Sequence, residues 1–193
     1  MMRLLITGFD PFHKNAENPS WLAAEALTDQ VGAYEVKKLR LPTVYGEAAK
    51  MVIEEAEKWK PDVILSLGLA GGRGAVTPER IGINLRSASI ADNAGQQFTD
   101  IPIIADGPAA YFSTLPVTAM AKAIRDRGLA GQVSNTAGTY VCNDVLYTLL
   151  HRFAGTATRV GFIHVPYIPG QGEPSMPLAD TVEALKRAIL AID

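Results

Sequence analysis

The stretch DVILSL at residues 62–67 is short and apolar, and it runs directly into a glycine-rich loop. Two further runs, MRLLITG at 2–8 and RVGFIHV at 159–165, share its length and character. Apolar runs of this length are typical of strands that are buried on both faces of a sheet. Between them the apolar spacing predicts helices at about 45–59 and 140–153. Strands that alternate with helices predict an α/β protein, with a mostly parallel, twisted sheet and helices on both faces.

Other segments complete this alternation. Asn18 is a preferred helix N-cap residue and Pro19 fits the first helical position, so a helix should begin there. Residues 86–114 are expected to be irregular, and long ordered loops in compact domains are usually functional or cover a site. The remaining expected elements are strands at 34–41, 80–85 and near 131–135, and helices at about 117–127 and 177–192.

Length and composition fit one globular domain over residues 1–193. Hydrophobic residues make up 48% of the chain and charged residues 20%, which is unlike a disordered protein. The net charge of −2 argues against a strongly basic surface of the kind that binds nucleic acids. No apolar run is long enough for a membrane span. The apolar run in the opening stretch MMRLLITGFDPF is too short for a secretory signal peptide. One cysteine excludes an intramolecular disulfide, and we expect a cytoplasmic protein.

The single cysteine, Cys142, falls in the first turn of the helix expected at 140–153. A helix N-terminus carries partial positive charge, which lowers the pKa of a thiol and offers N–H groups to an oxyanion. Cys142 also lies at helical spacing from Val145, Leu146 and Leu149, so an ordinary core residue is the competing interpretation. Spacing alone favours the core residue over a nucleophile.

A thiol nucleophile requires a base, and His164 ends the strand expected at 159–165. That position lies at the carboxyl edge of the sheet, where sites form in such folds. A buried core histidine is the stronger interpretation for this residue on its own. An acid should orient the imidazole, and the residues leave four candidates open. These acids are Glu79, Asp10, Asp92 and Asp144.

The glycine-rich loop Gly68–Gly74 matches neither the dinucleotide-binding G-x-G-x-x-G pattern nor the P-loop. We interpret it as a loop that approaches a pocket closely rather than as a phosphate site. One cysteine and three dispersed histidines lack the spacing of metal ligands, so no metal site is expected.

Specific motifs follow one another along nearly the whole chain. They read Gly8-Phe-Asp-Pro-Phe12 with Asn18-Pro-Ser20, Gly68-Leu-Ala-Gly-Gly-Arg73, Thr77-Pro-Glu-Arg-Ile-Gly-Ile-Asn84, Asp92-Asn-Ala-Gly-Gln-Gln97, Asp106-Gly-Pro-Ala-Ala-Tyr-Phe112, Ser134-Asn-Thr-Ala-Gly-Thr-Tyr-Val-Cys-Asn143 and Gly161-Phe-Ile-His-Val-Pro166. In these motifs the chain resembles the pyroglutamyl peptidase I (pyrrolidone-carboxylate peptidase) family of cysteine peptidases. The motifs that carry the cysteine and the histidine are highly specific.

The resemblance implies that Cys142 is the nucleophile, His164 the base and then the acid, and Glu79 the orienting carboxylate. It also implies an enzyme that removes an N-terminal pyroglutamyl (5-oxoproline) residue from peptides through a thioacyl intermediate, without metal or cofactor. The implied fold is a phosphorylase- and hydrolase-like α/β domain. Bacterial relatives are often homotetramers, so the resemblance further implies a homo-oligomer.

The chemistry of the pyroglutamyl ring predicts which kind of pocket would bind it. A lactam carries no charged amine, so the pocket should be apolar with a few hydrogen bonds. Asn18 is expected to hydrogen-bond the ring, although its role as a helix N-cap residue is an equal interpretation. The backbone N–H of Cys142 is the candidate oxyanion donor. Phe9 and Phe12 are expected to sandwich the ring, with Ile90, Tyr140 and Val141 closing the pocket.

The chain departs from the family pattern at a few positions. His13 and Lys14 stand where many members have two glycines, which should alter the mouth of the pocket. Ser89 stands where the family often has an arginine, and losing one oxyanion donor costs about 10²–10³ in rate elsewhere. Arg86 is the candidate to replace it. Asp144 stands in place of a frequent histidine.

Two other functions remain open from the residues. One is a catalytically weak relative that binds pyroglutamyl peptides but has lost efficient chemistry through Ser89. The other is a nucleoside phosphorylase-like enzyme, since that family shares the α/β architecture and has glycine loops. No convincing phosphate clamp is visible in the sequence, however.

Overall fold

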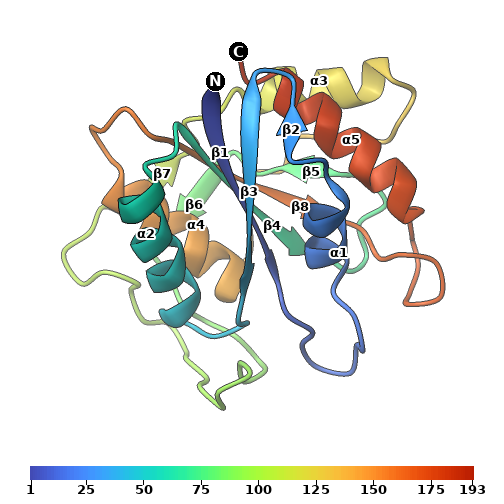
Figure 1. Cartoon of the computed structure of the whole chain (residues 1–193). Helices are drawn as coiled ribbons and strands as arrows, with labels where there is room; N and C mark the ends of the chain where they lie inside the picture. The colour runs from blue at the N-terminus through green and yellow to red at the C-terminus, as the bar shows by residue number, and fades with distance from the viewer.

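The predicted alternation of strands and helices is found in the computed structural model, which describes residues 1–193 (Figure 1). The first helix begins as expected, because the Asn18 side chain accepts a hydrogen bond from the backbone N–H of Ser20 and Pro19 occupies the first turn. In chain order the elements are β1 (Met2–Phe9), α1 (Pro19–Ala26), β2 (Gln30–Val31), β3 (Tyr34–Leu41), α2 (Glu47–Trp59), β4 (Val63–Leu69), β5 (Thr77–Pro78), β6 (Ile81–Ile83), β7 (Ala110–Phe112), α3 (Val117–Asp126), α4 (Val141–Arg152), β8 (Arg159–Val165) and α5 (Leu178–Leu190).

Six strands form the main sheet in the order β2-β3-β1-β4-β8-β5. β1 pairs in parallel with β3 and β4, and β4 pairs in parallel with β8. Only the two-residue edge strands, β2 and β5, run antiparallel to their neighbours. The prediction of a mostly parallel sheet is therefore confirmed, and Figure 1 shows its twist from β3 across to β8.

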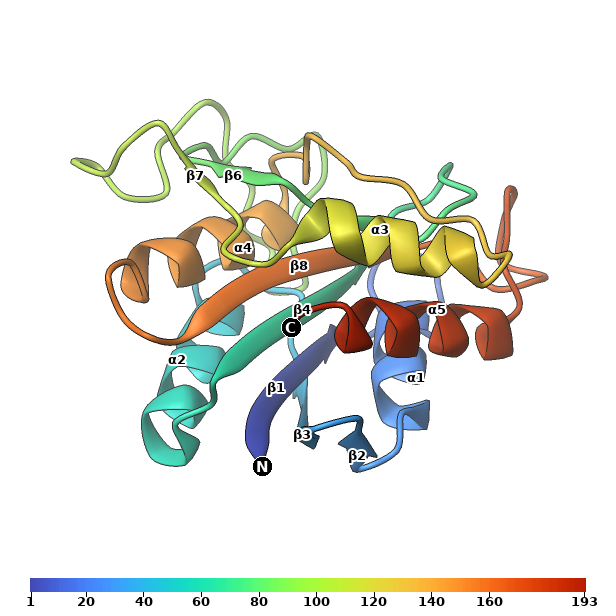
Figure 2. The ribbon, with the colours of Figure 1, turned by 90° about the horizontal axis from the view of Figure 1, so that it is seen from above.

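The sheet separates two apolar cores. Along β1, Leu4 and Ile6 belong to one core and Leu5 to the other, as the two-residue period of a strand requires. Helices α1, α3 and α5 cover the first face, and α2 and α4 cover the second (Figures 1 and 2). Helices on both faces were expected, and this expectation is confirmed. None of the helices combines the length and the apolar character needed to cross a bilayer.

Two strand predictions differ from the structure. The strand expected near 131–135 is reduced to isolated bridges from Gly131 and Ser134 to Val76 and Glu79. Pro78 explains the interruption, because it lies between the two bridges and has no N–H to donate to a ladder. The strand expected at 80–85 is shortened to β6, which pairs with β7 in a separate two-stranded sheet.

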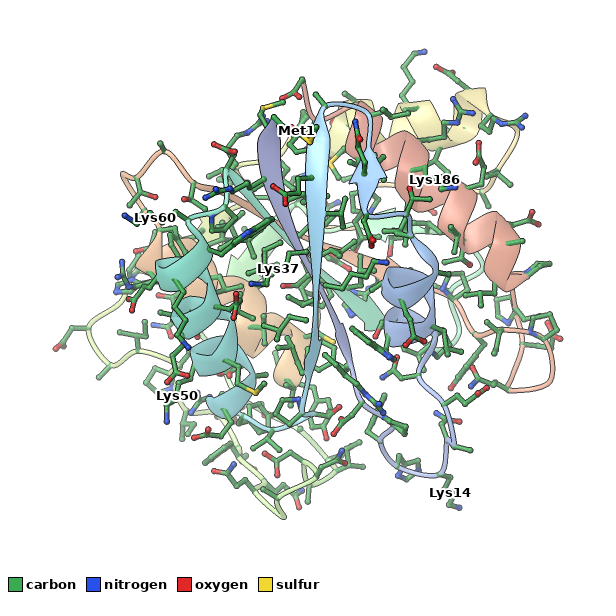
Figure 3. All side chains as sticks on the ribbon, viewed as in Figure 1. Met1, Lys14, Lys37, Lys50, Lys60 and Lys186 are labelled. Atoms are coloured by element: carbon green, nitrogen blue, oxygen red, sulfur yellow. The ribbon has the colours of Figure 1, made fainter.

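The parallel strands β1, β4 and β8 end at one edge of the sheet, and their following loops gather there. In the β4–β8 ladder, Gly68 lies directly opposite His164. Lys14 marks the tip of the loop between β1 and α1 at this end of the molecule (Figure 3). Sites in open α/β sheets form at such carboxyl edges. The N-terminus of α4 also lies at this edge, because the Cys142 side chain in its first turn packs against Gly68 near the end of β4.

Candidate active site

Cys142 lies in the first turn of α4, directly after the N-cap residue Tyr140 and the first helical residue Val141. Its side chain is half-buried. The sulfur packs against the backbone of Gly68, where an added Cβ atom would lie only 2.7 Å from Sγ. The thiol is therefore held against the end of β4.

His164 lies near the carboxyl end of β8 and is almost fully buried. Its Nδ1 atom is 2.7 Å from Oε1 of Glu79, which directly follows β5. The backbone fixes Glu79 in this place, because its N–H donates to the carbonyl oxygen of Phe162 at 2.9 Å. With Nδ1 engaged by the carboxylate, Nε2 is the imidazole nitrogen that remains for another partner.

The sheet brings the thiol and the imidazole to one place. Gly68, which contacts the Cys142 sulfur, is the β4 residue paired with His164 on β8. Both side chains line a cavity of about 260 Å³ at the carboxyl edge. The lining residues are Phe9, Phe12, Asn18, Thr43, Leu69, Ala70, Gly71, Arg73, Ala137, Gly138, Tyr140, Cys142 and His164.

Of the four acids that the sequence left open, Glu79 is the one that contacts His164. Asp10 and Asp92 accept hydrogen bonds within and between the neighbouring loops. Asp144 is fully buried and pairs with an arginine. The imidazole and the carboxylate are thus in contact, the thiol and the imidazole line the same cavity, and the carboxylate itself is not part of the lining.

The pKa of the Cys142 thiol is raised to about 12, first by burial and then by the negative charge of Glu79. The positive charge of Arg73 and a hydrogen bond from the backbone N–H of Cys142 act in the opposite direction. The helix start thus lowers the pKa of this thiol through the backbone N–H, as expected, but the effect of burial is larger and the net shift of the pKa is upward.

Four of the six expected pocket residues line the cavity, namely Phe9, Phe12, Asn18 and Tyr140. Ile90 does not, since it lies on the irregular segment and is 38% exposed. Val141 does not either: it is fully buried in the core between α2, α4 and the sheet. Adjacent residues at the start of a helix point in different directions, and Val141 takes the inward one while Cys142 faces the cavity.

Arg86 does not reach the cavity. Its Nε donates to Oδ1 of Asp144 at 2.6 Å, and its guanidinium lies over the rings of Tyr45 and Phe98, 5.5 and 5.4 Å from their centroids. Ser89 is exposed and does not line the cavity. The expectation that Arg86 replaces the family's arginine at the site is therefore not met.

The segment expected to be irregular, 86–114, contains the short strand β7 at its end but has no helix or strand over 86–109, and that part is tied to two walls of the cavity. Asn93 Nδ2 donates to the carbonyl oxygen of Pro11 at 3.0 Å, beside Phe12. The Tyr140 hydroxyl donates to the carbonyl oxygen of Ala91 at 3.0 Å. These bonds hold the aromatic side chains of the two walls in place, which fits the expectation that a long ordered segment serves a site.

Sequence reasoning missed several lining residues. The glycine-rich loop was expected to approach a pocket, and it does: Leu69, Ala70, Gly71 and Arg73 all line the cavity. Nothing in the sequence singled out Arg73 within that loop. Thr43 carried a usable signal, because it follows the strand expected at 34–41 at the same carboxyl edge.

The family model for pyroglutamyl peptidases matches residues 2–193 of the chain. A pyrrolidone-carboxylate peptidase of Levilactobacillus brevis is 50% identical over 198 residues, which cover 99% of this chain and 97% of that protein. One from Clostridium perfringens is 46% identical and covers 99% of this chain and 93% of that protein.

Solved structures agree with the sequence relatives. The pyroglutamyl peptidase I of Bacillus amyloliquefaciens superimposes with a TM-score of 0.96 at 39% identity, covering 100% of this chain and 97% of that one. A mutant pyrrolidone carboxyl peptidase of Pyrococcus furiosus gives a TM-score of 0.93 at 40% identity, covering 99% and 98%. The chain therefore belongs to the pyroglutamyl peptidase family.

Proposed function

We propose that this protein hydrolyses the bond after an N-terminal pyroglutamyl residue, with Cys142 as nucleophile, His164 as general base and acid, and Glu79 as the carboxylate that orients the imidazole. The observation that carries the proposal is the shared cavity of Cys142 and His164, with Glu79 Oε1 only 2.7 Å from Nδ1. Membership of a family of cysteine-type hydrolases supports the reaction class and favours it over a nucleoside phosphorylase.

In the proposal the reaction begins with a neutral thiol, which agrees with the burial that raises the pKa of Cys142. The thiol proton passes to Nε2 of His164 as the sulfur forms a bond to the pyroglutamyl carbonyl carbon. Glu79 accepts the hydrogen bond from Nδ1 and stabilises the imidazolium that forms. The carbonyl oxygen becomes an oxyanion, for which the backbone N–H of Cys142 at the N-terminus of α4 is the proposed donor.

Collapse of this intermediate breaks the C–N bond, and the leaving amine takes the proton from His164. The pyroglutamyl group remains on sulfur as a thioester. His164 then accepts a proton from water while the water oxygen attacks the thioester carbonyl. The C–S bond breaks, the proton returns from the imidazolium to sulfur, and free pyroglutamate leaves. Neither half of the cycle draws on a metal ion or an organic cofactor.

Aromatic rings give the cavity its apolar character. Phe9 is 2% exposed and packs against Phe162, with 6.5 Å between the ring centroids. Phe12 packs against Tyr140, with 6.1 Å between centroids. In the proposed complex the uncharged lactam ring lies among Phe9, Phe12 and Tyr140, and a charged N-terminal amine would lose its hydration there without a partner.

Asn18 has one hydrogen-bonding atom left for the ring. Its Oδ1 accepts from the N–H and the hydroxyl of Ser20, and its Nδ2 donates to the carbonyl oxygen of Asp10. An amide nitrogen carries two N–H bonds, so one donor remains. In the proposal this N–H donates to the lactam carbonyl oxygen, and Asn18 serves both as N-cap residue and as ring ligand.

Turnover of a fluorogenic pyroglutamyl amide tests the proposed function. The wild-type chain should release the fluorophore, and Cys142→Ala should lower kcat/KM by about 10³-fold or more. Iodoacetamide should block the wild type by alkylating its only thiol. The matching prolyl amide, which has a charged amine and no lactam carbonyl, is the substrate control and should be cleaved poorly.

A folded wild-type protein that binds pyroglutamyl peptides without cleaving the amide would contradict the proposal. That result would favour the alternative of a relative that binds pyroglutamyl peptides but is catalytically weak. Ser89, which is exposed and stands where the family often has an arginine, is the residue to which that alternative assigns the loss.

We also propose that the protein works in the cytoplasm as a homo-oligomer, a tetramer by its family resemblance. Phe112 supports an interface between copies, because it is 69% exposed on β7 of the two-stranded sheet. A mechanism that needs a free thiol supports a reducing compartment. Light scattering in solution measures the mass of the particle, and a monomer at micromolar concentration would contradict the oligomer.

A further inference from the structure

Glu79 is fully buried, and its carboxylate is paired with two side chains, those of Arg73 and His164. Oε1 accepts a hydrogen bond from Arg73 Nη1 at 2.7 Å and lies 2.7 Å from His164 Nδ1, whereas Oε2 has no hydrogen-bond partner. A buried carboxylate is costly unless it is paired with a positive charge. His164 is positive only when it is protonated, so Arg73 is the one permanent positive charge in contact with Glu79.

Two further hydrogen-bond acceptors around Arg73 fix its guanidinium in this place. Nη1 also donates to the Thr77 hydroxyl at 2.8 Å, and Nη2 donates to the carbonyl oxygen of Thr136 at 2.8 Å. Thr77 lies opposite His164 in the β5–β8 ladder. The planar guanidinium therefore joins the glycine-rich loop, β5 and the segment before α4, and a lysine ammonium could not reproduce this fork.

The protonation state of Glu79 decides which imidazole nitrogen is free. An ionised carboxylate only accepts hydrogen bonds, so His164 must carry its proton on Nδ1 and present an unprotonated Nε2. A protonated carboxyl could instead donate to Nδ1, which would place the imidazole proton on Nε2. In that tautomer Nε2 has no lone pair with which to accept the thiol proton.

We infer that Arg73 is a positioning residue: its guanidinium keeps Glu79 ionised and fixed against Nδ1, so that Nε2 of His164 is free to accept the proton of Cys142. The inference rests on the proposed function for its catalytic consequence, although the tautomer that it predicts does not depend on any substrate. Arg73 acts through Glu79 and exchanges no proton itself.

A double-mutant cycle with Glu79 tests the inference on turnover of the pyroglutamyl amide. Arg73→Gln should lower kcat/KM about 10- to 100-fold, mainly in kcat, because one charge-assisted hydrogen bond to the orienting carboxylate is lost. Arg73→Lys, which keeps the charge but loses the fork, should recover part of that loss. Once Glu79→Gln has removed the carboxylate, Arg73→Gln should change kcat/KM by less than about twofold.

The matched control is Arg152→Gln, which removes one positive charge from a surface pair with Glu57 at the far end of α4 and should leave kcat/KM unchanged. An equal loss from Arg73→Gln in both Glu79 backgrounds would overturn the inference, because Arg73 would then act on the substrate directly.

The tautomer of His164 gives a readout that needs no turnover. In protein carrying ¹⁵N-labelled histidine, NMR should show a single Nδ1–H tautomer for His164 in the wild type at a pH where the ring is neutral. Arg73→Gln should give a mixture of tautomers, as should Glu79→Gln, and Arg73→Lys should be intermediate. A single Nδ1–H tautomer in Arg73→Gln would overturn the inference.

The two measurements distinguish a failure of the proposed function from a failure of the inferred role of Arg73. A wild type that does not cleave the pyroglutamyl amide overturns the proposed function, while the tautomer measurement still decides the role of Arg73. If thermal unfolding shows that Arg73→Gln does not fold, Arg73→Lys carries both measurements, and wild-type kinetics together with an unchanged tautomer in that variant would overturn the inference.

Discussion

At position 68 the fold has no room for a side chain. A Cβ atom there would lie 2.7 Å from the Cys142 sulfur and 2.8 Å from the Phe162 ring. Gly68 is also the residue opposite His164 in the β4–β8 ladder. A glycine at this point lets the sulfur approach the strand pair that carries the imidazole. The close approach, rather than an unusual backbone angle, explains the requirement for glycine.

Gly68→Ala should therefore displace the thiol while leaving the fold intact. We expect kcat/KM for a pyroglutamyl amide to fall by about 10²-fold, since a displacement of roughly 1 Å has that effect in well-ordered sites. Gly74→Ala in the same loop is the control, because its Cβ would meet the Pro174 side chain at 3.3 Å, which requires a shift of only a few tenths of an ångström and involves no contact with the thiol. Wild-type kinetics in Gly68→Ala would show that the position of the sulfur does not matter.

At the scale of single residues, part of the site could be predicted from the sequence. Cys142 and His164 stood out because each falls where an element begins or ends at the carboxyl edge. The choice of Glu79 among four acids could not be made from spacing, because it depends on the two-residue strand β5 pairing with β8. Arg73 was missed for the same reason: its contacts with Glu79 and Thr136 join segments that are separate in the sequence.

At the scale of elements, a buried ion pair joins the starts of two helices to the irregular segment. Asp144, in the first turn of α4, accepts from Arg86 Nε at 2.6 Å and from the backbone N–H of Gly46, the N-cap residue of α2, at 2.9 Å. The backbone of Arg86 is bonded to that of Ile101 further along the segment. The carboxylate is fully buried and lies at a helix N-terminus, which favours a negative charge.

Removing the arginine should leave a buried, unpaired carboxylate. We expect Arg86→Met to lower the free energy of unfolding by about 3 kcal/mol, measured by urea denaturation. Arg86→Met combined with Asp144→Leu should recover part of that loss, because no charge then remains buried without a partner. A loss below about 0.5 kcal/mol in the single variant would mean that the pair contributes no more than a surface ion pair.

The elements themselves follow from the sequence to different degrees. Strands β1, β4 and β8 were predictable as continuous apolar runs, and the helices from the helical spacing of their apolar residues. The edge strands β2 and β5 were not, since each has two residues and no pattern can be read from so short a run. The strand expected near 131–135 fails because of Pro78 on the neighbouring segment, which a reading of 131–135 alone could not reveal.

At the scale of the whole molecule, buried thiol and phenol groups set the response to alkaline pH. The pKa of Cys142 is raised to about 12, and burial also raises the pKa of Tyr34, Tyr45, Tyr140 and Tyr147. In the unfolded chain these groups ionise near their ordinary values, about 8.5 for cysteine and 10 for tyrosine. The folded state therefore holds protons that the unfolded state releases, and stability present at neutral pH is lost as the pH rises above those values.

The contribution of Cys142 can be isolated by comparison with Cys142→Ala. Between about pH 9 and 11 the free energy of unfolding of the wild type should fall more steeply, by up to about 1.4 kcal/mol per pH unit. Urea denaturation at stepped pH values measures both slopes. Tyr34, Tyr45 and Tyr147 cancel because both proteins contain them, whereas Tyr140 cancels only in part, because the charge of Cys142 contributes to its raised pKa. Identical slopes would contradict a raised thiol pKa in the folded protein.

The central claim is that Cys142 carries the pyroglutamyl group during the reaction. Its most direct test is intact-mass spectrometry of the protein quenched in acid while it turns over a pyroglutamyl nitrophenyl ester, whose good leaving group makes hydrolysis of the thioester the slow step. We predict that the wild type gains the mass of one pyroglutamyl group, that peptide mapping places it on Cys142, and that Cys142→Ala gains none. An adduct on another residue, or an equal adduct in Cys142→Ala, would contradict the account.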